Sequence, residues 1–412
     1  METHFNALGQ SPANHVSLSP VSFLARAATV YAGQPATVQG DTRRSWSEVS
    51  DRIRRVAAGL IARGIGTGDT VTVIAPNVPE LFELHFAVPM AGAVLSTVNT
   101  RLEADTVAYI IDHSDSALIL AATDLLPLTE AALEKTERAP DVIEIRQPHA
   151  TDVESPSYDD LLATAPLQSS GLPKDEWQAI TLNYTSGTSG RPKGVVYHHR
   201  GAYLMALGTV PAWSMPSRPV YMSVVPMFHC NGWGHPWMLA VLGGTMVFPA
   251  SNAPADLFKT IAKEGVTHFG AAPVVLQTLA ESDAAPTGPF SPPLQVMTAG
   301  APPPPAILER MAALGLEVMH VYGLTETYGH IAQCLPQDAW ADLSPAEEAA
   351  HRARQGVSLP MVEEVAVIDR TTGQAVPKDA ETQGEIAIRG NTVMKGYYKD
   401  PDATAQAMRD GW

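Results

Sequence analysis

The stretch Tyr184-Thr-Ser-Gly-Thr-Ser-Gly-Arg-Pro-Lys-Gly194 stands between two short apolar segments that are typical of buried strands. Its glycines let the backbone approach an anion closely, and successive backbone N–H groups in such a loop form an anion-binding nest. The hydroxyls can donate to phosphate oxygens, Thr185 or Ser186 could also face a metal ion, and Lys193 adds a positive charge. The spacing does not fit the Walker A pattern. The stretch therefore predicts a polyphosphate-binding loop, and the alternative is a surface linker rich in Ser and Gly.

Upstream of this loop, helical and strand patterns alternate. A helix is expected with Ser47 as its N-cap, apolar residues at Val49, Ile53, Val56 and Leu60, and an end at Gly64. The pattern then predicts a buried strand over 70–75, a helix over 79–90, and strands over 93–97 and 117–121. Strands that alternate with helices in this way form parallel sheets covered by helices. Residues 147–174, rich in Pro, Ser, Thr and Asp, predict a connection to a second unit.

The second unit shows the same alternation of strands and helices as the first. Strands are expected over 179–183, 195–197, 220–225, 245–248, 267–270, 294–298 and 318–322, with helices over 255–264 and from Pro305 onward. Two later strands, 365–368 and 384–389, indicate a change to β-rich structure. The expected fold class is α/β. It comprises two layered α/β subdomains with mostly parallel sheets, 1–170 and 171–345, and a small β-barrel-like subdomain, 346–412.

Composition excludes several classes of protein. The 412 residues are 45% hydrophobic and 17% charged, which is typical of a globular protein of two or three domains. A net charge of −16 argues against nucleic acid as a partner. The two cysteines suggest neither disulfides nor a thiolate metal site and are interpreted as small buried apolar groups. Neither a signal peptide nor a membrane-spanning stretch is evident, so a cytoplasmic location is the expectation.

Three further motifs lie at the ends of expected strands, where open parallel sheets gather their ligands. They are Met227-Phe-His-Cys-Asn-Gly-Trp233, Thr298-Ala-Gly-Ala-Pro302 and Tyr322-Gly-Leu-Thr-Glu-Thr-Tyr-Gly329. Each alone fits a simpler interpretation, such as a loop histidine, a tight turn or a solvated carboxylate. Their succession after a phosphate loop favours one shared site.

With these motifs the chain resembles the large N-terminal part of the AMP-forming acyl-CoA synthetases, the superfamily that includes firefly luciferase and the adenylation domains of peptide synthetases. The similarity extends over residues 18–412. The segments Asn183-Tyr-Thr-Ser-Gly187 and Val195-Val-Tyr-His-His-Arg-Gly-Ala-Tyr203 resemble the branch of 3-methylmercaptopropionyl-CoA ligases and plant acyl-activating enzymes. The resemblance implies that ATP and Mg²⁺ activate a carboxylic acid as an acyl-adenylate, which CoA then receives as a thioester with release of AMP.

The resemblance also implies roles for individual residues. Phosphate contacts would come from Thr185, Ser186, Gly187, Thr188, Ser189, Gly190 and Lys193. Thr185 and Glu326 would help to place Mg²⁺, and Thr325 would contact the α-phosphate. Adenine would lie between Gly300, Ala301 and Pro302 on one side and Tyr322 on the other, with Gly323 beside it. The residues expected to act on the reacting groups are His229, Thr325 and Glu326, with His229 as a positioning and electrostatic residue.

The acid itself is predicted only as a class. Amino-acid-activating relatives place an Asp at the position of His229, so an amino acid is disfavoured. Acetate-specific relatives carry a Trp at the position of Gly323, so a longer pocket is expected here. Trp233, Tyr328 and His330 could limit its depth or stack on a substrate. A short- to medium-chain, branched, thioether or aryl carboxylic acid is the resulting expectation.

At Trp412 the resemblance predicts a missing part, because the family continues into a hinge and a mobile C-terminal lid domain. That domain is expected to be absent, and activity to be impaired. Two other interpretations stay open at this point: a fragment that binds ATP or acid with little turnover, and an ATP-dependent kinase or NTPase. The small-molecule partners would be the acid, ATP and CoA. A homodimer is a further expectation, because the resemblance to the family implies one.

Overall fold

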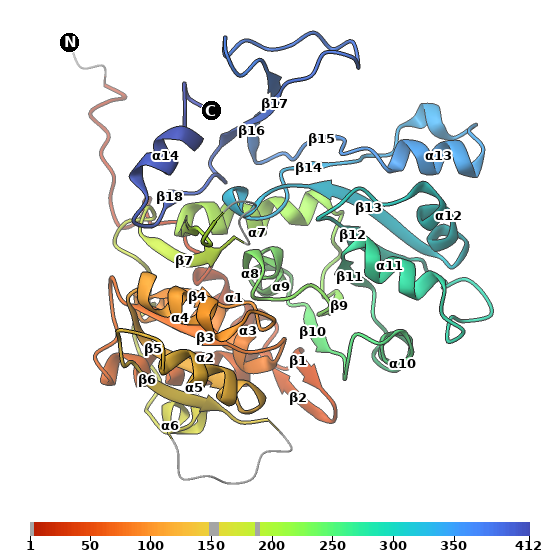
Figure 1. Cartoon of the computed structure of the whole chain (residues 1–412). Coiled ribbons are helices and arrows are strands. Elements are labelled where there is room, and N and C mark those ends of the chain that lie inside the picture. Colours follow the sequence, from red (N-terminus) through yellow and green to blue (C-terminus); the bar gives the residue numbers. More distant parts are fainter. Residues whose placement is uncertain (1–3, 148–155, 186–189) are drawn as a thin grey trace.

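The computed structural model describes residues 4–147, 156–185 and 190–412 (Figure 1). Two large mixed sheets with helices packed around them form the body of the molecule. The first sheet has seven strands in the order β18-β8-β7-β4-β3-β5-β6, and the second has nine in the order β15-β14-β13-β12-β11-β9-β10-β1-β2. The central strands of both sheets pair in parallel, and antiparallel pairs occur toward the edges. The expected α/β fold class is confirmed.

The strand bounds are as follows. The first sheet contains β3 (Thr70–Ile74), β4 (Val94–Thr97), β5 (Ser116–Ala122), β6 (Asp141–Ile145), β7 (Ala179–Tyr184), β8 (Gly194–His198) and β18 (Gly396–Tyr397). The second contains β1 (Pro35–Gln39), β2 (Thr42–Ser45), β9 (Val220–Met222), β10 (Thr245–Phe248), β11 (His268–Ala271), β12 (Leu294–Thr298), β13 (Leu316–Tyr322), β14 (Ala332–Gln333) and β15 (Val357–Ser358).

A separate antiparallel pair is formed by β16 (Val362–Ile368) and β17 (Glu385–Gly390). In the described residues this region shows a two-stranded sheet and no closed barrel. Its strands lie apart from the two large sheets, at the top of Figure 1.

The helices are α1 (Ser22–Val30), α2 (Trp46–Ala62), α3 (Pro79–Met90), α4 (Ala104–His113), α5 (Leu126–Leu133), α6 (Tyr158–Leu162), α7 (His199–Ala212), α8 (Cys230–Trp233), α9 (His235–Leu242), α10 (Pro254–Glu264), α11 (Pro273–Ala280), α12 (Pro305–Ala313), α13 (Pro345–Arg352) and α14 (Pro401–Ala407). None of the helices among the described residues is long and apolar enough to cross a membrane.

Helix α2 begins two residues earlier than its sequence pattern suggested. Ser45, and not Ser47, is the N-cap, because the Ser45 hydroxyl accepts from the backbone N–H of Glu48 while the Glu48 carboxylate accepts from the Ser45 backbone. This reciprocal capping box fixes the helix start. Ser47 lies inside the first turn, so its expected capping role was wrong.

Sheet membership does not follow the two halves of the chain. Strands β1 and β2 precede the whole first sheet in sequence, yet β1 pairs with β10 of the second sheet. Strands β7 and β8 follow residue 170, yet they extend the first sheet beside β4. The division into subdomains at residue 170 stays a prediction, and the sheets themselves interleave across it.

A shared core joins the two sheets. The buried indoles of Trp46 on α2 and Trp237 on α9 belong to one apolar cluster with residues of α3. Trp46 Nε1 donates to the Gly244 carbonyl at 3.1 Å, and Trp237 Nε1 donates to the His85 carbonyl at 3.0 Å. These hydrogen bonds satisfy the polar edge of each indole inside the core. The same core therefore supports both sheets and the loops at their junction.

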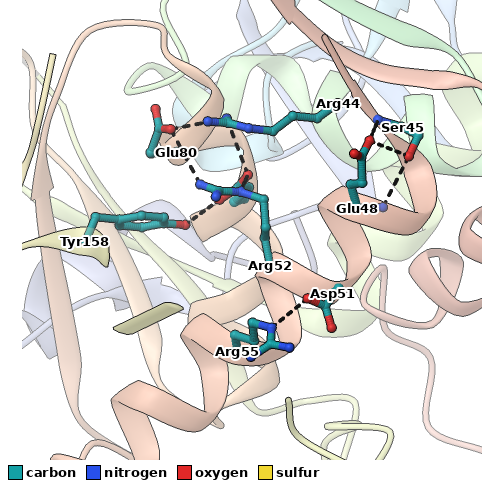
Figure 2. A network of polar contacts seen from close by, with 9 residues as sticks. Arg44, Ser45, Glu48, Asp51, Arg52, Arg55, Glu80 and Tyr158 are labelled. Carbon is teal, nitrogen blue, oxygen red and sulfur yellow. Dashed lines mark hydrogen bonds and ion pairs between the residues drawn. The ribbon is translucent and has the colours of Figure 1, made fainter. Parts of the chain in front are cut away.

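A buried ion-pair network reinforces this region (Figure 2). The Glu83 carboxylate has no exposed surface, and it accepts from Arg52 Nε at 2.6 Å and from the Tyr158 hydroxyl at 2.8 Å. Arg44 and Glu80 extend the network at its edge. Because every partner of the carboxylate is in place, the charge of Glu83 is compensated within the core.

Candidate functional site

A cavity of about 840 Å³ lies where strand ends of both sheets meet. One wall comes from the loop between β7 and β8. The others follow β9, β12 and β13 of the second sheet, and Tyr397 of β18 completes the lining. Loops at the carboxyl ends of parallel strands therefore surround the cavity, as expected for a ligand site in an open α/β sheet.

Most of the described residues that the sequence placed at the site line this one cavity. They are Thr185, Lys193, His229, Trp233, Gly300, Gly323, Thr325, Glu326 and His330. Ser186, Gly187, Thr188 and Ser189 lie outside the described residues. Ala301, Pro302, Tyr322, Tyr328 and Gly190 do not line the cavity.

The loop from β7 to β8 places a cation at one end of the cavity. The Thr185 backbone N–H donates to the Lys193 carbonyl at 3.0 Å, so the two ends of the loop are held together. Lys193 Nζ lies 4.8 Å from the ring centroid of Tyr397. Arg191 and Arg101 also line the cavity. These cations provide local positive charge in a chain whose net charge is −16, which suits a polyanionic ligand.

Tyr397 is a site residue that the sequence motifs missed. Its hydroxyl donates to Glu326 Oε1 at 2.7 Å, and burial together with the neighbouring carboxylate raises the pKa of Tyr397. It reaches the cavity because β18 pairs antiparallel with β8, with Gly396 opposite Val196. The sequence gives little indication that Tyr397 belongs to the site, because nearly two hundred residues separate the paired strands and no motif marks them.

Thr185 and Glu326 line the cavity and offer a hydroxyl and a carboxylate oxygen. Within residues 4–147, 156–185 and 190–412, no group of three or more His, Cys, Asp or Glu side chains is arranged to hold a metal ion. This sparse oxygen set fits Mg²⁺, which usually takes one or two protein ligands and completes its shell with waters and substrate phosphates.

The His229 motif is built on an unusual left-handed turn. Cys230, Asn231, Gly232, Trp233 and Gly234 all have positive φ, from 46° to 71°. For residues other than glycine this conformation costs about 1–2 kcal/mol each, so the surrounding structure has to hold it. His229, which precedes the turn, and Trp233, which lies within it, both line the cavity.

Asn231 anchors this turn through its buried amide. Its Oδ1 accepts from Thr181 Oγ1 at 2.9 Å and from Asn183 Nδ2 at 3.0 Å, both on β7. Its Nδ2 lies 3.4 Å from His85 Nε2 on α3. His85 Nδ1 faces the Leu81 carbonyl at 2.7 Å, so Nε2 is the acceptor for Asn231. Strand β7 of the first sheet and helix α3 thus fix a loop that follows β9 of the second sheet.

His229 is exposed on the cavity surface next to a buried thiol. Cys230 Sγ lies 3.9 Å from His229 Nε2 and 3.6 Å from Thr325 Oγ1. The contact with Cys230 raises the pKa of His229. The expectation that the cysteines are buried is confirmed for Cys230 and Cys334, although Cys230 also lines the cavity.

Apolar side chains form part of the cavity lining. Val224, Val225, Ala272, Val274 and Val275 line the cavity together with Trp233 and His330. Tyr328, expected there from the sequence, instead stacks on Tyr197 with ring centroids 3.9 Å apart, and its hydroxyl accepts from the His198 backbone N–H at 2.6 Å. Tyr328 therefore supports the wall from the core side.

Gly323 lines the cavity for a different reason from the one expected. A Cβ at this position would lie 1.5 Å from the Gly329 carbonyl oxygen, so backbone packing alone requires glycine. The backbone at Gly329 fills the space that a side chain at position 323 would take. The glycine therefore does not by itself lengthen the pocket. Trp233 and His330 also line the cavity, and their expected role in limiting its depth stays a prediction.

Comparisons with known proteins agree with this arrangement. The model of the family described as "AMP-binding enzyme" matches residues 24–398. The chain is 44% identical to the peroxisomal acetate/butyrate–CoA ligase AAE7 of Arabidopsis thaliana, over 98% of this chain and 74% of that protein. It is 41% identical to the 2-methylpropanoate–CoA ligase CCL4 of Humulus lupulus, over 97% of this chain and 74% of that protein.

The fold matches solved structures as well. The inhibitor-bound N-terminal domain of FACL13 from Mycobacterium tuberculosis superposes with a TM-score of 0.82 at 26% identity, covering 96% of this chain and 94% of that one. The family match covers most of the chain, and the relatives align over nearly its full length. This chain therefore belongs to the AMP-binding enzyme family.

Proposed function

We propose that the protein activates a short carboxylic acid with Mg-ATP and transfers the acyl group to CoA. In the first step a carboxylate oxygen attacks the α-phosphorus of ATP, the bond from that phosphorus to the β-phosphate breaks, and pyrophosphate leaves, which gives the acyl-adenylate. In the second step the CoA thiol attacks the acyl carbon, and AMP leaves. The observation that carries the proposal is one cavity whose lining includes Lys193 and Glu326 together with apolar side chains such as Trp233.

The chemistry needs no nucleophilic side chain, because the substrate carboxylate is the nucleophile. Catalysis then depends on positioning and on neutralising charge. In this proposal the positive charges of Lys193 and Arg191 stabilise the negative charge of the leaving pyrophosphate. Thr325 contacts the α-phosphate. Mg²⁺ held by Glu326 and Thr185 would neutralise further phosphate charge. Gly300, exposed at the end of β12, leaves open space for the adenine beside it.

His229 is proposed to position the acid. The contact with Cys230 raises the pKa of His229, which favours its charged form relative to a free histidine and suits attraction of a carboxylate better than removal of a proton. An amino acid substrate is disfavoured, because Glu326 is the only carboxylate among the described residues that line the cavity, and it already accepts a hydrogen bond from Tyr397 beside Lys193. The relatives named for acetate, butyrate and 2-methylpropanoate support a short acid. A cytoplasmic location and a homodimer stay predictions.

The test is acid-dependent exchange of labelled pyrophosphate into ATP, run across a panel of short linear, branched, thioether and aryl acids. Hydroxylamine added to the same reactions traps the acyl-adenylate. We expect exchange only with acid present. Exchange without acid, or release of ADP, would contradict the proposal and indicate a kinase or NTPase. ATP binding with no exchange for any acid would indicate a binding-only protein.

Single substitutions test the site. Lys193→Ala, Thr185→Ala and Glu326→Ala are each expected to lower the exchange rate by about tenfold or more, since each removes a charged or polar contact to the phosphates or metal. The exposed Lys378→Ala, in the loop after β16, is the matched control for Lys193. If all three site variants exchange as fast as the control, the site assignment is wrong.

A further inference from the structure

We propose that Thr181 and Asn183 of β7 are positioning residues for the reaction. Through the amide of Asn231 they fix His229 relative to the phosphate loop between β7 and β8, and so align the attacking carboxylate with the leaving pyrophosphate. This inference rests on the proposed function, because His229 and the phosphate loop have to hold the two substrates. It goes beyond that function, since these buried side chains do not line the cavity.

The three side chains form a closed set of hydrogen bonds. The Thr181 hydroxyl donates its single hydrogen to Asn231 Oδ1 at 2.9 Å and accepts from Asn183 Nδ2 at 3.0 Å. The second hydrogen on Asn183 Nδ2 is directed to Asn231 Oδ1, also at 3.0 Å. A hydroxyl has one hydrogen and an amide has two, so each hydrogen has one place in this set. Asn231 therefore has a fixed orientation, with its carbonyl oxygen toward β7.

Strand β7 carries both the contact with Asn231 and the start of the phosphate loop. Thr181 and Asn183 lie two residues apart, so they face the same side of the strand. The strand is paired on both edges, with β4 and with β8. Two residues beyond Asn183 lies Thr185, whose backbone N–H donates to the Lys193 carbonyl at 3.0 Å and closes the loop. The phosphate loop and the hydrogen-bonding side chains therefore share one rigid support.

The other partner, Asn231, lies two residues after His229. The Gly232 backbone N–H donates to the His229 carbonyl at 3.0 Å, so residues 229–232 form one tight turn. A shift of Asn231 is therefore passed directly to His229. Between His229 and Thr185 the connection consists of two residues of backbone on each side of these hydrogen bonds.

This connection matters because the reaction depends on alignment. In phosphoryl and nucleotidyl transfer the attacking and leaving oxygens have to lie roughly in line at the phosphorus. In the proposed function His229 positions the attacking carboxylate, and the phosphate loop holds the leaving pyrophosphate. A misplacement of about 1 Å, caused far from the reacting atoms, can slow a reaction about a hundredfold. Each substrate keeps its own contacts, so we expect a loss of alignment to lower kcat more than it changes KM.

The loop has further anchors on the other side of His229. Asn77 Oδ1 accepts from the Met227 backbone N–H at 2.8 Å, and Thr97 Oγ1 donates to the Phe228 carbonyl at 3.2 Å. These contacts remain when the hydrogen bonds from β7 are removed. Loss of the β7 contacts should therefore displace the turn without unfolding the loop.

The first test is Thr181→Val, which removes the hydroxyl and keeps the shape of the side chain. Pyrophosphate exchange with the fastest acid of the panel provides kcat and the KM values for ATP and acid. We expect kcat to fall by about tenfold to a hundredfold, and each KM to change by less than about threefold. Thr181→Ser keeps the hydroxyl and should recover most of kcat.

Thr72→Val is the matched control. Thr72 lies on β3 of the same sheet and is as buried as Thr181, and its hydroxyl is 2.5 Å from Ser116 Oγ. It takes no part in the hydrogen bonds to Asn231, so its kcat should stay at the parent value. An equal loss in Thr72→Val would assign the effect to a general loosening of the sheet and overturn the inference.

Asn183→Leu tests the same connection through a different residue. Asn183 Oδ1 is buried with no partner among the described residues, so leucine here removes only the bonds made by Nδ2. We expect the same pattern, a lower kcat with little change in KM. The double variant with Thr181→Val should lose little more than the larger single loss, because both side chains act through Asn231. This second variant keeps the inference open to test if Thr181→Val folds poorly.

Parent values of kcat in both Thr181→Val and Asn183→Leu would overturn the inference. So would a higher KM with an unchanged kcat, which would indicate a role in binding one substrate and not in alignment. If the parent exchanges pyrophosphate and the variants behave in either of these ways, the proposed function stands and this inference alone is wrong. A parent that exchanges with no acid would contradict the proposed function and this inference together.

Discussion

The phenolic hydroxyl of Tyr397 donates a 2.7 Å hydrogen bond to Oε1 of Glu326. The ring of the same tyrosine lies 4.8 Å from Lys193 Nζ. A residue from the last strand of the first sheet thus contacts both the carboxylate proposed to hold Mg²⁺ and the cation proposed to hold phosphate.

Removing this hydroxyl should weaken the use of Mg-ATP. Tyr397→Phe keeps the ring against Lys193 and loses the hydrogen bond to a charged acceptor, which is worth about 1.5–3 kcal/mol. We expect kcat/KM for Mg-ATP to fall by about tenfold, with a higher Mg²⁺ requirement in the pyrophosphate-exchange assay. Tyr398→Phe is the matched control, because the neighbouring Tyr398 donates to Asp115 at 2.9 Å and does not line the cavity. Equal effects of the two variants would contradict this role.

The left-handed turn at Asn231 should be sensitive to both side chain and backbone. Asn231→Ala removes the acceptor for Thr181 and Asn183 and places alanine at a φ of 53°. The expected loss in free energy of unfolding is about 2–4 kcal/mol, from unpaired groups and left-handed strain together. Asn231→Gly loses only the hydrogen bonds and should be less destabilised. Urea unfolding measures both, and equal losses would show that the backbone conformation contributes nothing.

The buried carboxylate of Glu83 should be costly to remove. Glu83→Ala leaves the Arg52 guanidinium and the Tyr158 hydroxyl without their main partner inside the core. The expected destabilisation is about 3–5 kcal/mol in urea unfolding. Asp51→Ala breaks the exposed pair with Arg55 and should cost about 0–1 kcal/mol. A loss at Glu83 no larger than that of the surface control would refute a structural role for the network.

Acid should destabilise the protein below pH 6.5. Burial lowers the pKa of His85, His198, His268 and His330 to about 4 each. In the unfolded chain these groups have a pKa of about 6.5, so between pH 6.5 and 4 unfolding takes up protons. Stability therefore falls as the pH is lowered through this window, by about 1.4 kcal/mol per pH unit for each histidine.

The measurement is the free energy of unfolding in urea at several pH values from 4.5 to 7.5. His268→Phe should flatten the dependence by one histidine's contribution, and His15→Gln, which changes an exposed histidine, is the control for histidine loss. An unchanged slope in His268→Phe would show that His268 takes up no additional proton on unfolding.

Local patterns predicted the elements with strong periodicity or clear boundaries. Helix α3, begun by Pro79, and strand β12 have the expected bounds. The loop at Lys193 and the motifs at His229 and Glu326 were also placed together, because each follows a strand whose end points to the same edge. These features depend on residues close to one another in sequence.

Features that depend on distant pairing could not be predicted. Tyr397 enters the site only through the pairing of β18 with β8, and β1 joins the second sheet only through β10. The left-handed conformation of Cys230 and Trp233 was equally hidden, since neither residue type favours it and only tertiary contacts hold it. Gly323 was noticed, but its reason is the Gly329 carbonyl and not an open pocket.

The interleaving of β1, β2, β7 and β8 between the sheets bears on how the molecule responds to a break in its backbone. A single proteolytic nick between residues 163 and 175 would leave the N-terminal piece holding β1 and β2 of the second sheet. The C-terminal piece would hold β7, β8 and β18 of the first. Each piece would complete a sheet of the other. We expect the two pieces of the nicked chain to elute together in gel filtration and to separate only in denaturant. An intact backbone between residues 163 and 175 is then not needed to hold the native structure together.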